Sequence, residues 1–459
     1  MNIEMSSEEN KEKNKDDIPF TKFQILKNLV AISCGFLFIF IPFQSITNLQ
    51  STLNKEDGLG TGGLAIIYGA LVISCMFLPS FVISHLGCKW TIAASMVCYL
   101  LYMAANFHAV WSLIVPASVI IGLGSAPLWS AKCSYLTRMA IRYAHLTNSS
   151  AHHVMSRFFG FFFMVYQTCE IWGNIISSQV LSDEVEDNFT LTTYELRKCG
   201  ANYDPGIQMN NTNLDRPNNS KVHILCWIYM ASVTFGFLII VLFLQNIPGN
   251  NEDKQQEGKL LPSLMVETFK HLWKSPYQKL LVILTIYSGV EQAFIAGDFT
   301  KSYISCAIGI GNVGFVMISY GIVNAICSLS FGKLMMYVGQ IPLFAFAFVV
   351  HGGTQTALLP QQEPVYIIYI FAGLWGIGDA VIQAQINALY GFLFKDNLEP
   401  AFSNYRLFEA IGFLIAFAWS NFLKTYVKLY ICLGLLTVGI GMYGIVEMLE
   451  RTNKKKGME

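Results

Sequence analysis

The chain has 459 residues, of which 53% are hydrophobic and only 13% are charged. A soluble protein of this composition would have more apolar surface than it could bury, so an ordinary soluble domain is excluded. The formal net charge is zero and no basic stripe with interleaved aromatic residues occurs, so nucleic acid is not an expected partner.

Runs of about 20 apolar residues recur along the chain, and this is the length that crosses a hydrocarbon core of roughly 30 Å. They lack the strict alternation of barrel strands, so we expect helices that satisfy their own backbone hydrogen bonds in lipid. The predicted fold class is an all-α polytopic membrane protein with about twelve transmembrane helices. The expected spans are residues 29–49, 63–84, 91–109, 113–136, 158–180, 223–244, 280–300, 308–331, 341–359, 365–393, 402–423 and 429–449.

A polar segment after the sixth span divides these helices into two halves of six. The charged start of the chain has almost nothing apolar before Phe20 and resembles a solvated tail rather than a secretory signal. The expected organisation is an N-terminal tail (1–26), a first half (27–247), a linker (248–277), a second half (278–449) and a C-terminal tail (450–459).

The basic residues indicate an orientation. On this plan the 30 Lys and Arg residues divide into 22 on the side of the tails and linker and 8 on the other side. The positive-inside rule then puts both termini in the cytoplasm. We expect the plasma membrane, with an endosomal or endoplasmic reticulum membrane as the alternative.

The only long loop on the expected outer side, residues 182–221, carries three Asn-X-Ser/Thr sequons, at Asn188, Asn210 and Asn218. We expect at least one to be glycosylated, although such short motifs also arise by chance. Cys199 lies in the same loop, and Cys306 falls near the outer end of the seventh span. A disulfide between them is one interpretation, which sequence alone leaves open because it fixes no distance.

The two halves share sequence features. Gly122-Leu-Gly124-Ser-Ala-Pro recurs as Gly376-Ile-Gly378-Asp-Ala-Val, displaced by 376 − 122 = 254 residues. Tyr68-Gly and Gly87 recur as Tyr320-Gly and Gly339, each displaced by 252. The paired glycines favour close helix packing, and a flexible point between helices is the alternative.

Ionisable residues inside membrane spans are costly and suggest a functional site by default. The candidates are Glu170, Glu291, Asp298, Asp379, Arg406 and Glu409. One hypothesis is a proton- or cation-linked relay or substrate site, and the other is a set of buried polar contacts that hold helices together. Arg406 and Glu409 are three residues apart on one helix face, which favours a structural pair.

No motif in the sequence indicates an enzyme, a cofactor or a metal. The eleven cysteines form no CxxC pair, and no phosphate-binding glycine loop, nucleophile elbow or zinc helix occurs. The predicted protein is therefore not an enzyme and binds no metal or cofactor.

Two halves of six spans with cytoplasmic termini resemble the major facilitator superfamily. The gate motif of that superfamily between the second and third spans keeps its spacing here around Gly87 and Lys89 but has lost its acidic residue and most basic ones. The loss weakens the case for ordinary alternating access.

More specific stretches resemble the unc-93 family. They are residues 56–60 (EDGLG), 74–79 (SCMFLP), 122–132 (GLGSAPLWSAK), 172–178 (WGNIISS), 287–289 (YSG), 387–391 (NALYG) and 404–407 (NYRL). The resemblance implies a facilitator-like membrane protein whose relatives act as partners of other membrane proteins, among them two-pore-domain potassium channels and Toll-like receptors.

The predicted function is that of an accessory or regulatory partner, with a potassium channel subunit as the expected client and lipid as its surroundings. The first alternative is a secondary transporter of an unidentified small solute that uses Glu170, Glu291 or Asp379 for coupling. The second is a trafficking escort for a membrane receptor.

Overall fold

The computed structural model describes residues 20–149, 151–181, 193–207, 211–247, 270, 272–360, 366–394 and 398–456. Within these ranges the regular secondary structure is helical. The long helices are α2 (Lys22–Leu53), α3 (Leu59–Ala105), α4 (Trp111–Thr147), α5 (Ala151–Leu181), α7 (Asn219–Phe243), α10 (Pro276–Ala293), α12 (Val313–Val338), α13 (Gln340–Ala357), α14 (Tyr366–Leu393), α15 (Leu398–Trp419) and α16 (Thr425–Lys456).

Short helical segments complete the described chain. The π-helix η5 (Phe294–Ser305) continues α10, and π geometry inside a helix often marks a functional position. The remaining segments are η1 (Glu56–Gly58), η2 (Asn106–His108), α6 (Thr193–Leu196), η3 (Gly200–Asn202), η4 (Thr212–Leu214), α11 (Cys306–Ile308) and η6 (Ile310–Asn312).

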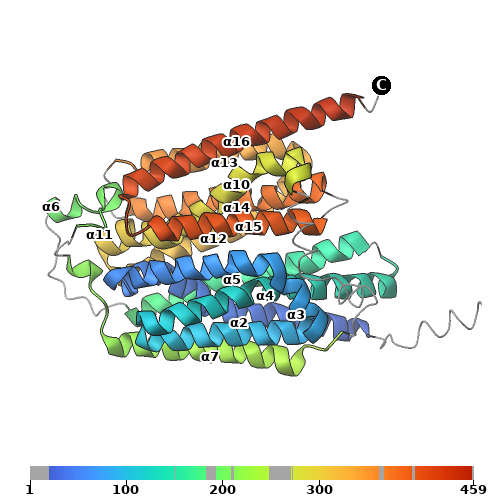
Figure 1. Cartoon of the computed structure of the whole chain (residues 1–459), viewed down its shortest axis with the longest axis horizontal. Coiled ribbons are helices and arrows are strands. Elements are labelled where there is room, and N and C mark those ends of the chain that lie inside the picture. Colours follow the sequence, from blue (N-terminus) through green and yellow to red (C-terminus); the bar gives the residue numbers. More distant parts are fainter. Residues whose placement is uncertain are drawn as a thin grey trace, which may run out of the picture.

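The helices form two groups that lie side by side (Figure 1). Helices α2 to α7 make the first group and α10 to α16 the second. We call the end where α2 finishes and α7 begins the loop end, and the opposite end, where α16 finishes, the tail end. In Figure 1 the loop end, with α6 and α11, is on the left.

The number of helices agrees with the spans expected from the sequence. Among the described residues, nine helical segments are long and apolar enough to cross a membrane. The helices α5, α13 and α15 pack among them, and nine plus three gives twelve. Much of the linker expected at 248–277 lies outside the described residues, as do most of the N-terminal tail and the last three residues.

The repeated glycines Gly87 and Gly339 mark equivalent breaks. Gly87 has φ +69° inside α3 and divides that helix into two spans, while Gly339 has φ +79° between α12 and α13. Positive φ is strained for residues with a side chain, which explains why glycine recurs at these positions. This part of the two-fold sequence pattern therefore marks equivalent breaks between successive spans.

Helix starts are fixed by local chemistry. Thr21 and Gln24 form a capping box, in which Thr21 Oγ1 accepts the Gln24 N–H over 3.2 Å and Gln24 Oε1 accepts the Thr21 N–H over 2.9 Å. Ser275 caps α10, and Pro276 follows at the first helical position.

The two halves meet through side chains near the loop end. Thr52 of α2 donates to Ser305 of η5 over 2.9 Å, and Asn421 after α15 donates to Thr61 of α3 over 2.6 Å. Tyr68 of α3 stacks on a phenylalanine ring of α15 at a centroid distance of 4.2 Å. These contacts hold the halves together at the loop end.

Candidate functional site

The glycines of α14 bring three helices together. A Cβ atom at Gly376 would lie 2.7 Å from the carbonyl oxygen of Tyr320 on α12, and one at Gly378 would lie 1.8 Å from the ring of His351 on α13. Such contacts exclude any larger residue, so glycine permits the close approach. Asp379 follows directly and is thereby placed within this junction.

The matching glycines of the first half do the same for α3 and α4. A Cβ atom at Gly122 would lie 2.3 Å from the carbonyl oxygen of Ile67, and one at Gly124 would lie 2.8 Å from a cysteine sulfur of α3. Here the residue after the second glycine is Ser125, whose hydroxyl lies 3.0 Å from that of Tyr99. The first half therefore repeats the packing with a neutral side chain.

Asp379 and Glu291 form the centre of the candidate site. The Tyr320 hydroxyl donates to Asp379 Oδ2 over 2.6 Å, and the Asn324 amide donates to the same oxygen. The Trp375 indole N–H donates to Glu291 Oε2 over 2.7 Å. Both carboxyl groups are buried, at 4% and 0% exposed. The structure thus brings together two of the acids that the sequence singled out.

A neutral histidine lies beside this pair. His351 Nε2 is 3.1 Å from the carbonyl oxygen of Trp375, which can only accept, so Nε2 carries the hydrogen. His351 Nδ1 then accepts from the Tyr287 hydroxyl over 2.7 Å, and Gln355 donates to that hydroxyl over 2.9 Å. In this tautomer the His351 ring is uncharged.

Glu170 of α5 reaches the site from the other half. Its carboxyl accepts from Gln44 over 2.8 Å, from Asn174 over 3.0 Å and from Asn48 over 3.3 Å. A Cβ atom added at Gly321 would lie 3.3 Å from the Cβ of Glu170. Gly321 directly follows Tyr320, whose hydroxyl donates to Asp379. Glu170 therefore lies where the halves meet, and the described hydrogen-bond donors to its carboxyl are side-chain amides.

Arg406 and Glu409 form the pair that their spacing predicts. Arg406 Nη1 lies 2.6 Å from Glu409 Oε2. Tyr405 and Ser288 donate to Glu409 Oε1 over 3.0 and 3.2 Å. This carboxylate has a cation and two further donors, which is the arrangement of a structural contact between α10 and α15.

Asp298 is separate from Glu291, although the two are seven residues apart in sequence. Lys428 of α16 lies 2.6 Å from Asp298 Oδ1, and Ser420 donates to the same oxygen over 2.7 Å. Lys428 and Asp298 are both at least nine-tenths buried. The structure therefore does not group Asp298 with the other acids in one polar site, because Asp298 is paired with Lys428.

Lys132 of α4 is a buried cation that the sequence analysis did not single out. Its ammonium lies 4.5 Å from the ring centroid of Phe162, 4.8 Å from Trp129 and 4.9 Å from Phe163. The side chain is 1% exposed, so aromatic faces take the place of water. The signal that could have found it is a lysine inside an apolar run whose helical neighbours are aromatic.

The loop end carries the expected cysteines. Cys199 and Cys306 form a disulfide with their Cα atoms 5.6 Å apart. Asn211 donates to the Cys306 carbonyl oxygen over 2.8 Å, which packs the loop on the second half. Asn218 is exposed and caps α7 through Ser220. The other two sequons, at Asn188 and Asn210, lie outside the described residues.

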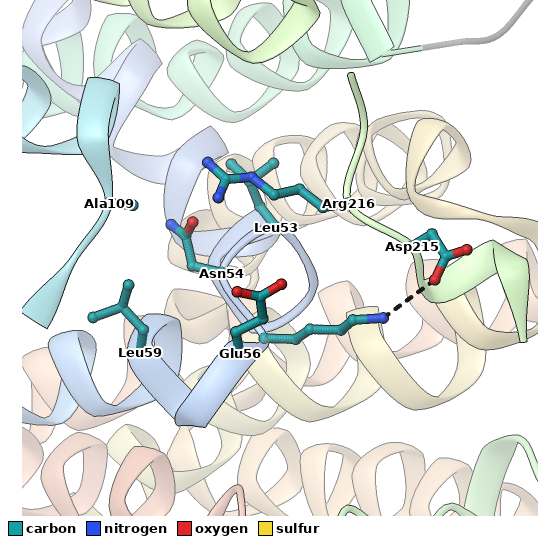
Figure 2. A pocket seen from close by; sticks show the side chains of 8 residues that line it. Leu53, Asn54, Glu56, Leu59, Ala109, Asp215 and Arg216 are labelled. Atoms are coloured by element: carbon teal, nitrogen blue, oxygen red, sulfur yellow. Dashed lines mark ion pairs between the residues drawn. The ribbon is translucent and has the colours of Figure 1, made fainter. Parts of the chain in front are cut away.

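A cavity of about 280 Å³ opens at the loop end, away from the acids (Figure 2). Charged groups of both signs line it, and Lys55 pairs with Asp215 over 3.6 Å (Figure 2). The lining residues are Leu53, Asn54, Lys55, Glu56, Leu59, Ala109, Asp215 and Arg216.

Sequence reasoning missed the donors of the site. The sequence presents Tyr320 only as part of the repeat, and it does not single out Trp375 as a donor. Asn324 lies one helical turn after Tyr320, so a Tyr-x-x-x-Asn spacing opposite an intramembrane acid was the available signal.

Solved transporter structures share this arrangement of helices. A D-xylose-proton symporter superposes on 91% of this chain and 97% of its own, with a TM-score of 0.64 and 11% identity. A nucleoside transporter superposes on 90% and 98%, with a TM-score of 0.61 and 12% identity. At such identity the likeness shows the fold alone. The chain is a multi-pass helical membrane protein with the major facilitator fold.

Sequence comparison shows the family. A family model described as "Ion channel regulatory protein UNC-93" matches residues 50–354 and 350–443. "Protein unc-93 homolog A" of Xenopus laevis is 42% identical over 94% of this chain and 95% of its own length. The protein of that name from Homo sapiens is 40% identical over 93% and 94%. The chain belongs to the UNC-93 family.

A more distant relative carries a functional description. The "Putative potassium channel regulatory protein unc-93" of Caenorhabditis elegans is 34% identical to this chain. The match covers 96% of this chain and 63% of the relative. The family resemblance expected from the short motifs is confirmed.

Proposed function

We propose that this protein is a non-enzymatic accessory subunit of a membrane-protein client and that the client is a potassium channel. The observation that carries the proposal is the ion channel regulatory family match across both halves. The description of the nematode relative as a putative potassium channel regulator supports the same client.

The proposed location is the plasma membrane, with the loop end outside and both termini in the cytoplasm. The Cys199–Cys306 disulfide supports this orientation, because disulfides persist in oxidising compartments. The exposed sequon at Asn218 lies at the same end. Endosomal and endoplasmic reticulum membranes have the same topology relative to the cytoplasm and remain alternative locations.

A client in the same membrane would contact the lipid-facing helices. On α7, Trp227 and Leu242 are 66% and 69% exposed, so this helix offers large apolar groups to a neighbouring helix. On α13, Val349 is 68% exposed on the other half and gives a matched comparison position. We propose α7 as the client contact because it flanks the first half along its full length (Figure 1).

Proximity labelling in intact cells, with the tag at the C-terminal end, tests the client. A potassium channel should be enriched, and Trp227→Ala should reduce that enrichment several-fold while Val349→Ala leaves it unchanged. Currents of the enriched channel should change when this protein is co-expressed. Enrichment of a receptor in place of a channel would instead identify a trafficking escort, and an absence of enriched membrane proteins would contradict both.

A second candidate function is transport of a small solute. The observation that favours it is the set of acids near the contact between halves, Glu170, Glu291 and Asp379, in a fold shared with solved symporters. For a transporter, Glu291→Gln and Asp379→Asn should each abolish uptake while surface expression is retained. If both variants reach the surface and still support the client, the acids are not required for the accessory function.

A further inference from the structure

Glu291 and Asp379 face one another although they lie on different helices. Trp375 precedes Asp379 by one helical turn on α14, so the two share a helix face. Because Trp375 donates to Glu291 over 2.7 Å, that face is turned toward α10. Asp379 therefore lies on the face of α14 that meets Glu291.

Each acid has one oxygen with hydrogen-bond donors and one without. Glu291 Oε2 and Asp379 Oδ2 accept the bonds from Trp375, Tyr320 and Asn324. Glu291 Oε1 and Asp379 Oδ1 are buried and receive no hydrogen bond from any described residue. A buried carboxylate oxygen without a donor is costly, and one hydrogen held between these two oxygens would satisfy both.

The groups around the pair supply no compensating positive charge. Two cations of the second half are engaged elsewhere, Arg406 with Glu409 and Lys428 with Asp298. With its hydrogen on Nε2, His351 accepts from Tyr287 at Nδ1, and this tautomer carries no charge. The titratable groups that face the pair from the packed helices are Tyr287, Tyr320, His351, Glu409, Cys432 and, from the other half, Glu170.

The first half shows that the fold does not need these acids. Gly122 and Gly376 make matching contacts, which places Ser125 where Asp379 lies. A Cβ at Gly173 would lie 2.3 Å from the Ile41 carbonyl oxygen, and one at Gly412 would lie 2.2 Å from that of Ile286.

This second match places Ile46 where Glu291 lies, five residues after the shared contact, and Ile46 is fully buried. The same helix crossings are therefore built with serine and isoleucine in one half and with two acids in the other. Packing alone does not explain the acids.

The donors around the pair do not suit a divalent metal cation. A cation such as Mg²⁺ or Ca²⁺ takes six or more oxygen ligands, whereas indole N–H, amide N–H and phenol O–H groups point at this site. Among the described residues, no group of three or more His, Cys, Asp and Glu side chains is arranged to hold a metal ion.

We infer that Glu291 and Asp379 form a proton-binding site, in which one proton taken from water is shared between Glu291 Oε1 and Asp379 Oδ1. The site connects to the contact between halves through α12, because Tyr320 donates to Asp379 and the adjacent Gly321 packs on Glu170. Movement of α5 against α12 would alter the Tyr320 bond and hence proton occupancy. This inference does not depend on the identity of the client.

Infrared spectroscopy of the purified full-length protein in lipid nanodiscs tests the site. The probe is the C=O stretching band of a protonated carboxyl group, which shifts in D₂O, recorded at neutral pH. Wild-type minus Glu291→Gln and wild-type minus Asp379→Asn spectra should show the same band with the intensity of one carboxyl. The double variant should lose no more band intensity than either single variant loses.

The control is Glu409→Gln. The Glu409 carboxylate is paired with Arg406, so this variant should leave the band unchanged. Formation of the Cys199–Cys306 disulfide and a monodisperse elution profile show that each variant has folded. Two distinct bands that are lost additively would mean independent acids, and the absence of a band would mean that both are ionised. Carboxylate bands that respond to added K⁺ or Na⁺ would assign a metal cation. Each of these three results would overturn the shared proton.

Discussion

At the scale of single residues, Gly378 shows how one missing side chain positions the site. Gly378→Ala would place a methyl group 1.8 Å from the His351 ring, a clash that we expect to cost about 1–3 kcal/mol. Gly391→Ala in the same helix is the matched control, since a Cβ there meets nothing within 4 Å. Thermal unfolding in detergent should show a lower midpoint for Gly378→Ala only.

Lys428 gives a second residue-scale prediction. Lys428→Met would leave Asp298 buried without its cation, which we expect to destabilise the protein by about 3–5 kcal/mol. The double variant Lys428→Met with Asp298→Asn removes both charges and should recover much of that loss. The thermal midpoint measures both effects. Equal midpoints for the single and double variants would show that the charge pair is not the cause.

At the scale of elements, the disulfide fastens the loop before α7 to the start of α11. It joins positions 107 residues apart, and removing such a crosslink typically costs about 2–4 kcal/mol. Cys199→Ser with Cys306→Ser should therefore lower the thermal midpoint. A reducing agent should lower the wild-type midpoint to the same value and leave the double variant unchanged. An effect of reductant on the double variant would point to another cysteine.

At the scale of the whole molecule, a crosslink between the halves at the loop end would distinguish the two candidate functions. Thr61→Cys with Asn421→Cys places thiols on α3 and after α15, where the native side chains are 2.6 Å apart. A short thiol crosslinker should then lock the halves together. Locking should abolish solute uptake by a transporter, because alternating access needs the halves to move. It should leave channel regulation intact if the client binds the lipid-facing surface of α7. The single-cysteine variants, treated with the same reagent, are the control.

Much of the fold was predictable from the sequence, and less of the site. The helices follow from apolar run length, and the recurrence of Gly87 and Gly339 in the sequence marks two positions that have positive φ. The Arg406–Glu409 pair was predictable because it lies within one helix turn. The Trp375–Glu291 bond joins residues 84 positions apart, and no local pattern encodes which helix faces meet.

The sequence by itself determined that this chain is a bundle of membrane helices, because an isolated apolar span in lipid satisfies its backbone hydrogen bonds only as a helix. Its repeated glycines and its short motifs determined the two-fold repeat and the UNC-93 family. Only the tertiary structure decided which intramembrane acids are neutralised. Asp298 meets Lys428 from 130 residues away. Among the described residues, the hydrogen-bond partners of the Glu291 and Asp379 carboxyl groups are neutral donors: Trp375, Tyr320 and Asn324. The physical reason is that a buried charge is governed by its neighbours within a few ångströms, and those neighbours are set by helix rotation and packing.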